Sequence, residues 1–222
     1  MSAVITERIV EPMVLHFQEV LKKLNEEEFE QFCYDNRDMR IELTKEGDLI
    51  VMPPRGGETG IKNFSLNGQF YIWVETNGTG YGFDSSTLFT LPNGAKRSPD
   101  LSWIKKERWE ALTKKERKKF SPICPDFVVE LRSDTDSLRT LQDKMEEYIE
   151  NGAGLGWLID PIKKKVYVYC PNANVEKLEN PQTVSGEPLL KGFVLKSGHI
   201  LFFCVFAAFA ARCRLRRAVR FF

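Results

Sequence analysis

The stretch PDFVVELRS, residues 125–133, is a short aromatic and β-branched run with one carboxylate, Glu130, inside its apolar part. Its composition and length are typical of a buried strand. Glu130 lies between Val129 and Leu131, and burying an unpaired carboxylate is costly. Such residues are usually paired, protonated or bound to a metal. The stretch therefore predicts a core strand that carries a candidate functional residue.

A second carboxylate, Asp100, follows Ser98-Pro99 where another apolar strand is expected to begin. Two strand-borne carboxylates suit Mg²⁺, which prefers oxygen ligands and usually takes one or two carboxylates plus waters and substrate. Such a cation can organise phosphate oxygens and lower the pKa of a water for phosphodiester hydrolysis. The alternative is structural, with Asp100 capping a turn and Glu130 in an internal ion pair. Asp126 is a weaker partner, because it lies about 13 Å along the strand from Glu130.

Two cationic residues follow Glu130 in the sequence. Arg132 is two residues further on, so it is expected on the same strand face. It could neutralise charge in a transition state or form a salt bridge. Lys144 lies on the flank of the next predicted helix, and helical side chains lean toward the helix N-terminus. Lys144 could therefore reach back to the Glu130 strand, or remain a solvated lysine.

Other charged positions are open to two interpretations. Glu58 precedes a predicted helix, where it could add a third carboxylate or simply favour the helix N-terminus. Residues 105–119 contain eight basic and three acidic residues, which could contact phosphates or form a solvated charged helix. We find no phosphate-binding loop and no histidine cluster, so a serine or cysteine hydrolase with a histidine base has little support.

Composition favours one cytosolic domain of ordinary size. The chain has 222 residues and a formal net charge of +1. Without the five arginines of residues 201–222, 27 basic residues face 31 acidic ones, so the domain is not a general polyanion binder. Five cysteines without CxxC spacing indicate reduced thiols and a cytoplasmic location. No N-terminal signal peptide is recognisable.

We therefore expect a single domain over residues 1–200 and an atypical apolar and basic tail over residues 201–222. The apolar run in the tail is shorter than the about 20 residues that span a bilayer. The tail could be a membrane-surface anchor or an idiosyncratic extension, and no membrane association is expected. We also expect no small-molecule cofactor.

The order of predicted elements indicates an α/β fold with a mixed β-sheet flanked by helices. Helices are expected at residues 14–23, from Asn25 to about Asn36, at 61–75 and at 137–150. Strands are expected as a hairpin at 40–52, as a pair formed by 81–84 and 88–91, and at 101–104, 127–131, 157–159 and 166–169.

Taken together, these motifs resemble a bacterial family of restriction endonucleases of the Uma type, within the PD-(D/E)XK nuclease superfamily. The resemblance covers roughly residues 20–196. It depends on Glu58 before a helix, Ser98-Pro99-Asp100, the stretch 125–133, Lys144 with Tyr148, and the stretch 156–161. Each motif is weak alone and specific in combination. Residues 201–222 match nothing in the family.

The resemblance implies a restriction-endonuclease-like core and Mg²⁺-dependent cleavage of DNA. It assigns the metal to Asp100 and Glu130, with Glu58 in support. The superfamily lysine falls at Arg132, and members of the family often carry a lysine on the next helix instead, here Lys144. The catalytic set would be Asp100, Glu130, Lys144 and Arg132. A homodimer would suit a duplex cutter. The alternatives are an inactive nucleic-acid-binding module and a protein-interaction module of the same fold.

Overall fold

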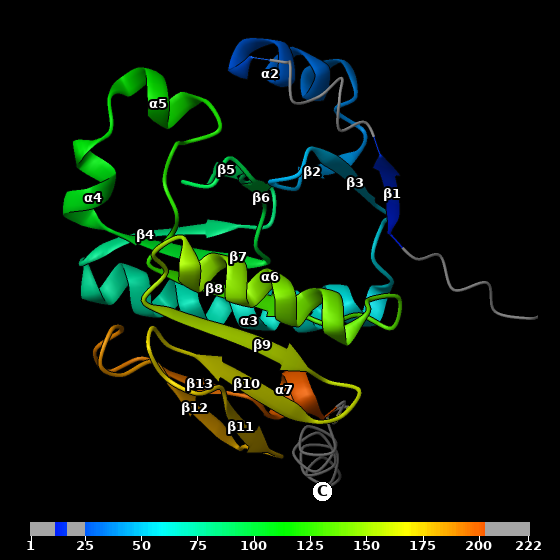
Figure 1. The fold of residues 1–222 in the computed structure, drawn as a ribbon. Coiled ribbons are helices and arrows are strands. Elements are labelled where there is room, and N and C mark those ends of the chain that lie inside the picture. Colours follow the sequence, from blue (N-terminus) through cyan, green and yellow to red (C-terminus); the bar gives the residue numbers. More distant parts are fainter. Residues whose placement is uncertain (1–11, 17–24, 203–222) are drawn as a thin grey trace, which may run out of the picture.

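The computed structural model describes residues 12–16 and 25–202 (Figure 1). The strands are β1 (Met13–His16), β2 (Arg40–Leu43), β3 (Asp48–Met52), β4 (Gly80–Asp84), β5 (Phe89–Thr90), β6 (Lys96–Arg97), β7 (Leu101–Lys105), β8 (Phe127–Leu131), β9 (Leu155–Asp160), β10 (Lys165–Tyr169), β11 (Glu176–Glu179), β12 (Thr183–Ser185) and β13 (Val194–Lys196). The helices are α2 (Glu26–Asp35), α3 (Gly57–Asn77), α4 (Lys106–Ala111), α5 (Lys114–Lys118), α6 (Leu138–Glu150) and α7 (Gly198–Leu201).

A six-stranded mixed sheet forms the centre of the fold, in the order β11-β10-β9-β8-β7-β4. Strands β8 and β9 are parallel, and the other neighbouring pairs are antiparallel. A parallel pair requires a crossover connection, and α6 supplies it between β8 and β9. The helix packs against β8, β9 and β10. The mixed α/β architecture with flanking helices confirms the fold class predicted from the sequence.

The two faces of the central sheet pack against different helices. Because side chains alternate along a strand, Phe127, Val129 and Leu131 of β8 join the core that includes Leu66 and Phe70 of α3. Val128 of β8 belongs instead to the core that contains Met145 and Tyr148 of α6. The even-numbered positions of β8, including Glu130, therefore face α6. The alternation of this one strand decides which helix Glu130 can meet.

A second sheet lies beside the first and contributes to the same region. Its order is β1-β3-β2-β6-β5. The predicted hairpin at residues 40–52 is present as β2 and β3, paired from Arg40 with Met52 to Leu43 with Leu49. Helix α2 begins at Asn25 with a capping box, in which the Asn25 side chain accepts from Glu28 N–H and the Glu28 side chain accepts from Asn25 N–H. The helix start predicted at Asn25 is confirmed.

Two local predictions are wrong. Residues 13–16 form strand β1, paired with β3, where the apolar spacing predicted a helix; the remaining positions of that predicted helix, 17–23, lie outside the described residues. Residues 80–84 do not pair with 88–91, because β4 pairs with β7 and β5 pairs with β6. In both places tertiary pairing overrides the local pattern.

The atypical tail expected at residues 201–222 lies almost wholly outside the described residues, which include only residues 201 and 202 of it. Within residues 12–16 and 25–202, no helix is both long and apolar enough to cross a bilayer.

Candidate active site

Asp100 and Glu130 lie on neighbouring strands, at the same end of the β7–β8 pair. The two strands are registered from Trp103 opposite Phe127 to Leu101 opposite Val129. One position beyond the last pair, Asp100 donates its N–H to Val129 O at 3.0 Å. Asp100 is 0% exposed and Glu130 is 2% exposed. The register therefore brings together, on adjacent strands, the two carboxylates that the sequence singled out.

Lys144 of α6 contacts two carboxylates at once. Its Nζ lies 2.8 Å from Glu130 Oε1 and 2.8 Å from Oε1 of Glu42 on strand β2. The Tyr148 hydroxyl, one helical turn further, donates to Glu130 Oε1 at 3.1 Å. Helix α6 thus covers Glu130 with an ammonium group and a phenol. The sequence left open whether Lys144 would reach the strand, and in this structure it does.

The buried charges continue beyond Lys144. Glu42 accepts from Ser98 N–H at 2.9 Å and faces Arg97 Nη1 at 3.4 Å. Arg97 Nε in turn donates to Glu147 Oε2 at 2.6 Å. Glu130, Lys144, Glu42, Arg97 and Glu147 therefore form an alternating chain in which three acids share two cations. The chain carries an excess of negative charge, which favours a proton or another cation within it.

That excess changes the proton affinity of the groups. Burial raises the pKa of Glu130 to about 7, and the nearby charges of Asp100 and Glu42 add to this effect while Lys144 opposes it. Burial also acts to raise the pKa of Glu42, but Lys144, Arg97 and Ser98 N–H outweigh it and the pKa is lowered. Burial acts to lower the pKa of Lys144, yet Glu130 and Glu42 hold it above its ordinary value. Lys144 is therefore an ammonium group at neutral pH.

Asp100 is held by a different set of donors. Arg55, between β3 and α3, places Nη2 at 2.7 Å from Asp100 Oδ1 and Nη1 at 2.8 Å from Oδ2. The N–H of Leu131 donates to Oδ2 at 2.8 Å, and Arg40 Nη2 lies 3.4 Å from Oδ1. The two carboxylates are thus neutralised by different cations from different parts of the chain.

The other two predicted residues lie at the margin. Arg132 shares the face of Glu130, but its Nη1 pairs with Asp160 Oδ2 at 2.9 Å and its Nε donates to Asp136 O at 3.2 Å. Glu58 is exposed in the first turn of α3 and lines a cleft of about 300 Å³ with Arg55 and Asp136. Arg55 also lines the larger cleft beside Glu130, so the two clefts adjoin at Arg55, and no contact of Glu58 with Asp100 or Glu130 is described.

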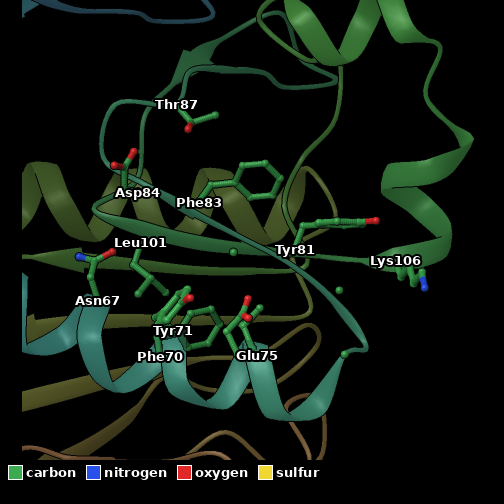
Figure 2. Close-up of a pocket in the computed structure, with 14 residues that line it drawn as sticks. Asn67, Phe70, Tyr71, Glu75, Tyr81, Phe83, Asp84, Thr87, Leu101 and Lys106 are labelled. Atoms are coloured by element: carbon green, nitrogen blue, oxygen red, sulfur yellow. The ribbon is translucent and has the colours of Figure 1, made fainter.

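A cleft of about 560 Å³ reaches Glu130, while Asp100 lies behind Arg55 and is not part of the cleft wall. This wall includes Glu42, Arg55, Glu130 and Lys144, together with polar and acidic residues along the whole length of α6. Another cleft, of about 670 Å³, lies on the α3 side of the sheet (Figure 2). Figure 2 shows Tyr71 and Glu75 of α3 on one side of this cleft and strand β4, which carries Tyr81, on the other. That second cleft contains neither Asp100 nor Glu130, so the charged chemistry belongs to the α6 side.

The donors at the α6 side suit a hard divalent cation. Asp100 and Glu130 offer carboxylate oxygens, and Leu131 O lies 3.4 Å from the same Arg55 nitrogen that contacts Asp100. A positively charged group therefore already lies among these oxygens. In the part of the chain that the structure describes, no three His, Cys, Asp or Glu side chains are grouped to hold a metal. Mg²⁺ needs fewer, since water and phosphate oxygens normally complete its shell.

Three residues of this site were not predicted from the sequence. Glu42 carries the same signal that singled out Glu130, a carboxylate between apolar residues in a short strand, in the order Ile41-Glu42-Leu43. Arg55 follows Pro53-Pro54 in a segment that reads only as a loop. Arg97 belongs to the short strand β6. For Arg55 and Arg97 the sequence has no comparable signal, because their partners lie on distant elements.

The sheet topology defines a mixed α/β protein with two buried carboxylates on adjacent strands. A crystal structure from Anabaena variabilis, described as "a putative nuclease belonging to DUF820", shares this fold with a TM-score of 0.62 and 19% sequence identity; the match covers 72% of this chain and 89% of that one. No curated protein matches the chain. The model of the Uma2 family, described as "Putative restriction endonuclease", matches residues 26–198. The chain belongs to this family, as the motifs around Asp100, Glu130 and Lys144 indicated, and the class that the family describes is a nuclease.

Proposed function

We propose that this protein is a metal-dependent endonuclease that hydrolyses phosphodiester bonds of DNA. The observation that carries the proposal is the placement of Asp100 and Glu130 on adjacent strands, with an open cleft at Glu130 and the Lys144 ammonium group in contact with Glu130. Membership of the family supports the hydrolytic class. Mg²⁺ is the cation that best suits an oxygen-only donor set of this size.

In the proposed site, Asp100 and Glu130 hold the cation and Glu58 supports it from the adjoining cleft. The bound Mg²⁺ would lower the pKa of a water and polarise the scissile phosphate. Glu130 must be ionised to act as a ligand, and its raised pKa makes this pH-dependent. Tyr148 fixes the orientation of the Glu130 carboxylate through its hydroxyl.

Lys144 acts as an electrostatic group in this proposal. Its raised pKa keeps it protonated, so it can orient the attacking water and stabilise negative charge at the phosphate. Removing a proton from water would require Lys144 to be neutral, which the two adjacent carboxylates oppose. Arg132 adds positive charge on the same face. Because it pairs with Asp160, it would stabilise charge at the phosphate by its electrostatic field and not by direct contact.

DNA would lie over the α6 side of the molecule, where the cleft opens. The basic stretch of residues 105–119 is partly neutralised, since Lys119 pairs with Glu30 at 2.6 Å and Lys115 with Glu27 at 3.7 Å. These pairs favour local phosphate contacts over a broad basic surface. A homodimer would allow two such sites to cut both strands. We place the protein in the cytoplasm, where DNA and Mg²⁺ are both present.

The test compares metal binding and DNA nicking in the same samples. Asp100→Asn and Glu130→Gln should both lose Mg²⁺ binding by calorimetry and lose nicking of supercoiled plasmid. Asp126→Asn is the matched control, because Asp126 is another buried carboxylate at the opposite end of β8. Loss of nicking in all three variants alike would point to a general folding effect and would leave the assignment of the metal to Asp100 and Glu130 without support.

One observation favours a second function, a DNA-binding module that does not cut. All the oxygen positions of Asp100 already face donors, from Arg55, Arg40 and Leu131. A protein that uses Asp100 only structurally would bind DNA with the same affinity in Mg²⁺ and in EDTA and would show no nicking. The calorimetric test separates this function from the nuclease.

A further inference from the structure

Arg55 approaches Asp100 with both of its terminal nitrogens. The contacts are 2.7 Å from Nη2 to Oδ1 and 2.8 Å from Nη1 to Oδ2, a two-pronged geometry that is the strongest arrangement for an arginine and a carboxylate. The Arg55 side chain is 23% exposed and Asp100 is fully buried. The guanidinium group therefore closes Asp100 off from the cleft.

The carboxylate of Asp100 has no oxygen position left for another ligand. An ionised carboxylate offers about four lone-pair positions. At Oδ1 these face Arg55 and, in a longer contact of 3.4 Å, Arg40. At Oδ2 they face Arg55 and the N–H of Leu131 at 2.8 Å. A metal ion can bind Asp100 only if one of these donors leaves.

Arg55 is the donor that is able to leave. Leu131 N–H is fixed in the backbone of β8. Arg40 is anchored independently, because its Nη2 donates to Ser98 O at 2.8 Å. Arg55 borders both the cleft of about 560 Å³ and the adjoining one of about 300 Å³, so its side chain has open space on two sides. Its only other described contact in this site is the 3.4 Å approach of Nη1 to Leu131 O.

The position of the guanidinium group is that of a bound cation. Nη1 contacts both Asp100 Oδ2 and Leu131 O. The negative charge of Glu130 also attracts the Arg55 guanidinium group. Carboxylate and backbone carbonyl oxygens are the donor types that a hard divalent ion takes. The same oxygens cannot serve the guanidinium group and a metal ion together.

We propose that Arg55 holds the place of the cation in the metal-free protein, and that Mg²⁺ and the Arg55 guanidinium group exclude one another at Asp100. The proposal rests on the metal site of the proposed function and adds a positioning residue to it. Arg55 neutralises the charge of Asp100 and holds its carboxylate in place until the metal replaces it. The exchange lowers the apparent affinity for Mg²⁺, because the bidentate contact must break first.

The experiment is calorimetric titration of MgCl₂ into the EDTA-stripped full-length chain, for wild type, Arg55→Gln and Arg108→Gln. Removing the competing contact should tighten Mg²⁺ binding by Arg55→Gln about 10- to 100-fold, the factor equivalent to a hydrogen bond between charged groups. Arg108→Gln is the matched control, because Arg108 pairs with buried Asp126 at 3.0 Å at the other end of β8. Its Mg²⁺ affinity should equal that of wild type.

A second variant and a second readout protect the test against a loss of folding. Arg55→Lys keeps the charge but cannot form the two-pronged contact, so its Mg²⁺ affinity should lie between those of wild type and Arg55→Gln. Thermal unfolding should show a larger stabilisation by Mg²⁺ for Arg55→Gln than for wild type, because the metal restores the charge that the substitution removed.

The outcomes separate the two proposals. If wild type binds Mg²⁺ and Arg55→Gln binds it equally or more weakly, the exchange at Asp100 is wrong while the metal site of the proposed function stands. If neither protein binds Mg²⁺, both proposals are wrong. Tighter binding by Arg55→Gln that disappears in Arg55→Gln/Asp100→Asn would support the exchange at Asp100.

Discussion

The two faces of strand β8 differ in what they bury: one packs apolar side chains and the other carries a charged residue. On the α3 side, Phe127 packs edge-on against Trp157 with ring centroids 4.9 Å apart, in a core built from apolar side chains. On the α6 side, three residues later and on the other face, Glu130 is almost as deeply buried but contacts Lys144 and Tyr148. The comparison teaches that one face of the strand stabilises the fold with apolar contacts, whereas the other buries charges that Lys144 and Tyr148 must partner.

Removing the cation from the charged face is expected to have the largest effect. Lys144→Met takes away the ammonium group that contacts both Glu42 and Glu130. Plasmid nicking should fall by about 10²–10⁴-fold, the range for a group that orients water and stabilises transition-state charge. Lys165→Met is the control, since Lys165 pairs with exposed Glu179 on the surface, away from Glu130. Nicking by Lys144→Met at the wild-type rate would contradict the division between the faces.

Phe127→Ala tests the apolar face. The ring is fully buried between Phe70 of α3 and Trp157 of β9, so its loss should destabilise the protein by about 3–5 kcal/mol. Urea unfolding measures this change. The affinity for Mg²⁺ of the folded protein should not change. A large change in metal affinity would show that the two faces of β8 are coupled.

Glu130→Gln tests the charged face through its pH dependence. The pKa of Glu130 is raised to about 7 in the folded protein, from 4.5 in an unperturbed side chain. The folded state therefore retains a proton that the unfolded state releases, and this contribution to stability is lost as pH rises from 4.5 through 7. Glutamine does not titrate, so the variant should be more stable than wild type by roughly 3 kcal/mol at pH 8 and nearly equal to it at pH 4.5.

Unfolding by urea at both pH values is the measurement. The same stability difference at pH 4.5 and pH 8 would mean that Glu130 is ionised throughout and that Lys144 fully compensates its burial. Wild type measured in saturating Mg²⁺ should lose the pH-dependent difference, because the metal stabilises the ionised form.

Phe64→Ser is expected to have the smallest effect. Phe64 lies on the outer side of α3 and is 83% exposed, in contrast to the buried Phe70 two turns away. Thermal unfolding of the variant should change stability by no more than about 0.5 kcal/mol. A clear loss of stability, or a change in sedimentation, would show that this face of α3 is covered in solution, as in a homodimer.

The sequence predicted most of the central sheet because its signals are local. The apolar run at residues 127–131 and the helix that follows predicted the strand of Glu130 and the helix of Lys144, and left open whether Lys144 would reach Glu130. The hairpin at residues 40–52 was also predicted, but not that Glu42 would contact Lys144, which is 102 residues away. Nothing local tells where a hairpin docks on a sheet. The contact of Arg55 with Asp100 was missed for the same reason, since it depends on how two distant segments meet.

The error at residues 80–91 has a similar cause. Two short runs separated by turn residues favoured a local pair, yet β4 found a longer partner in β7, with five registered positions. Strand β5 pairs with β6 over only two. Side-chain packing between strands decides which partner a strand takes. The sequence of one run alone does not show how well it packs against each possible partner.

The register of β7 against β8 also limits how the chain length can vary. One residue gained or lost within β7 or β8 would turn Asp100 or Glu130 to the α3 side, because successive side chains point to opposite faces. The connection between the two strands, which carries α4 and α5, lies at the far end of the sheet from α6's first turn (Figure 1). Insertions between α4 and α5, around Thr113, would leave that register unchanged. Related genes should therefore differ in length there while keeping β7 and β8 constant, and the same position would accept a tag or a fused binding domain.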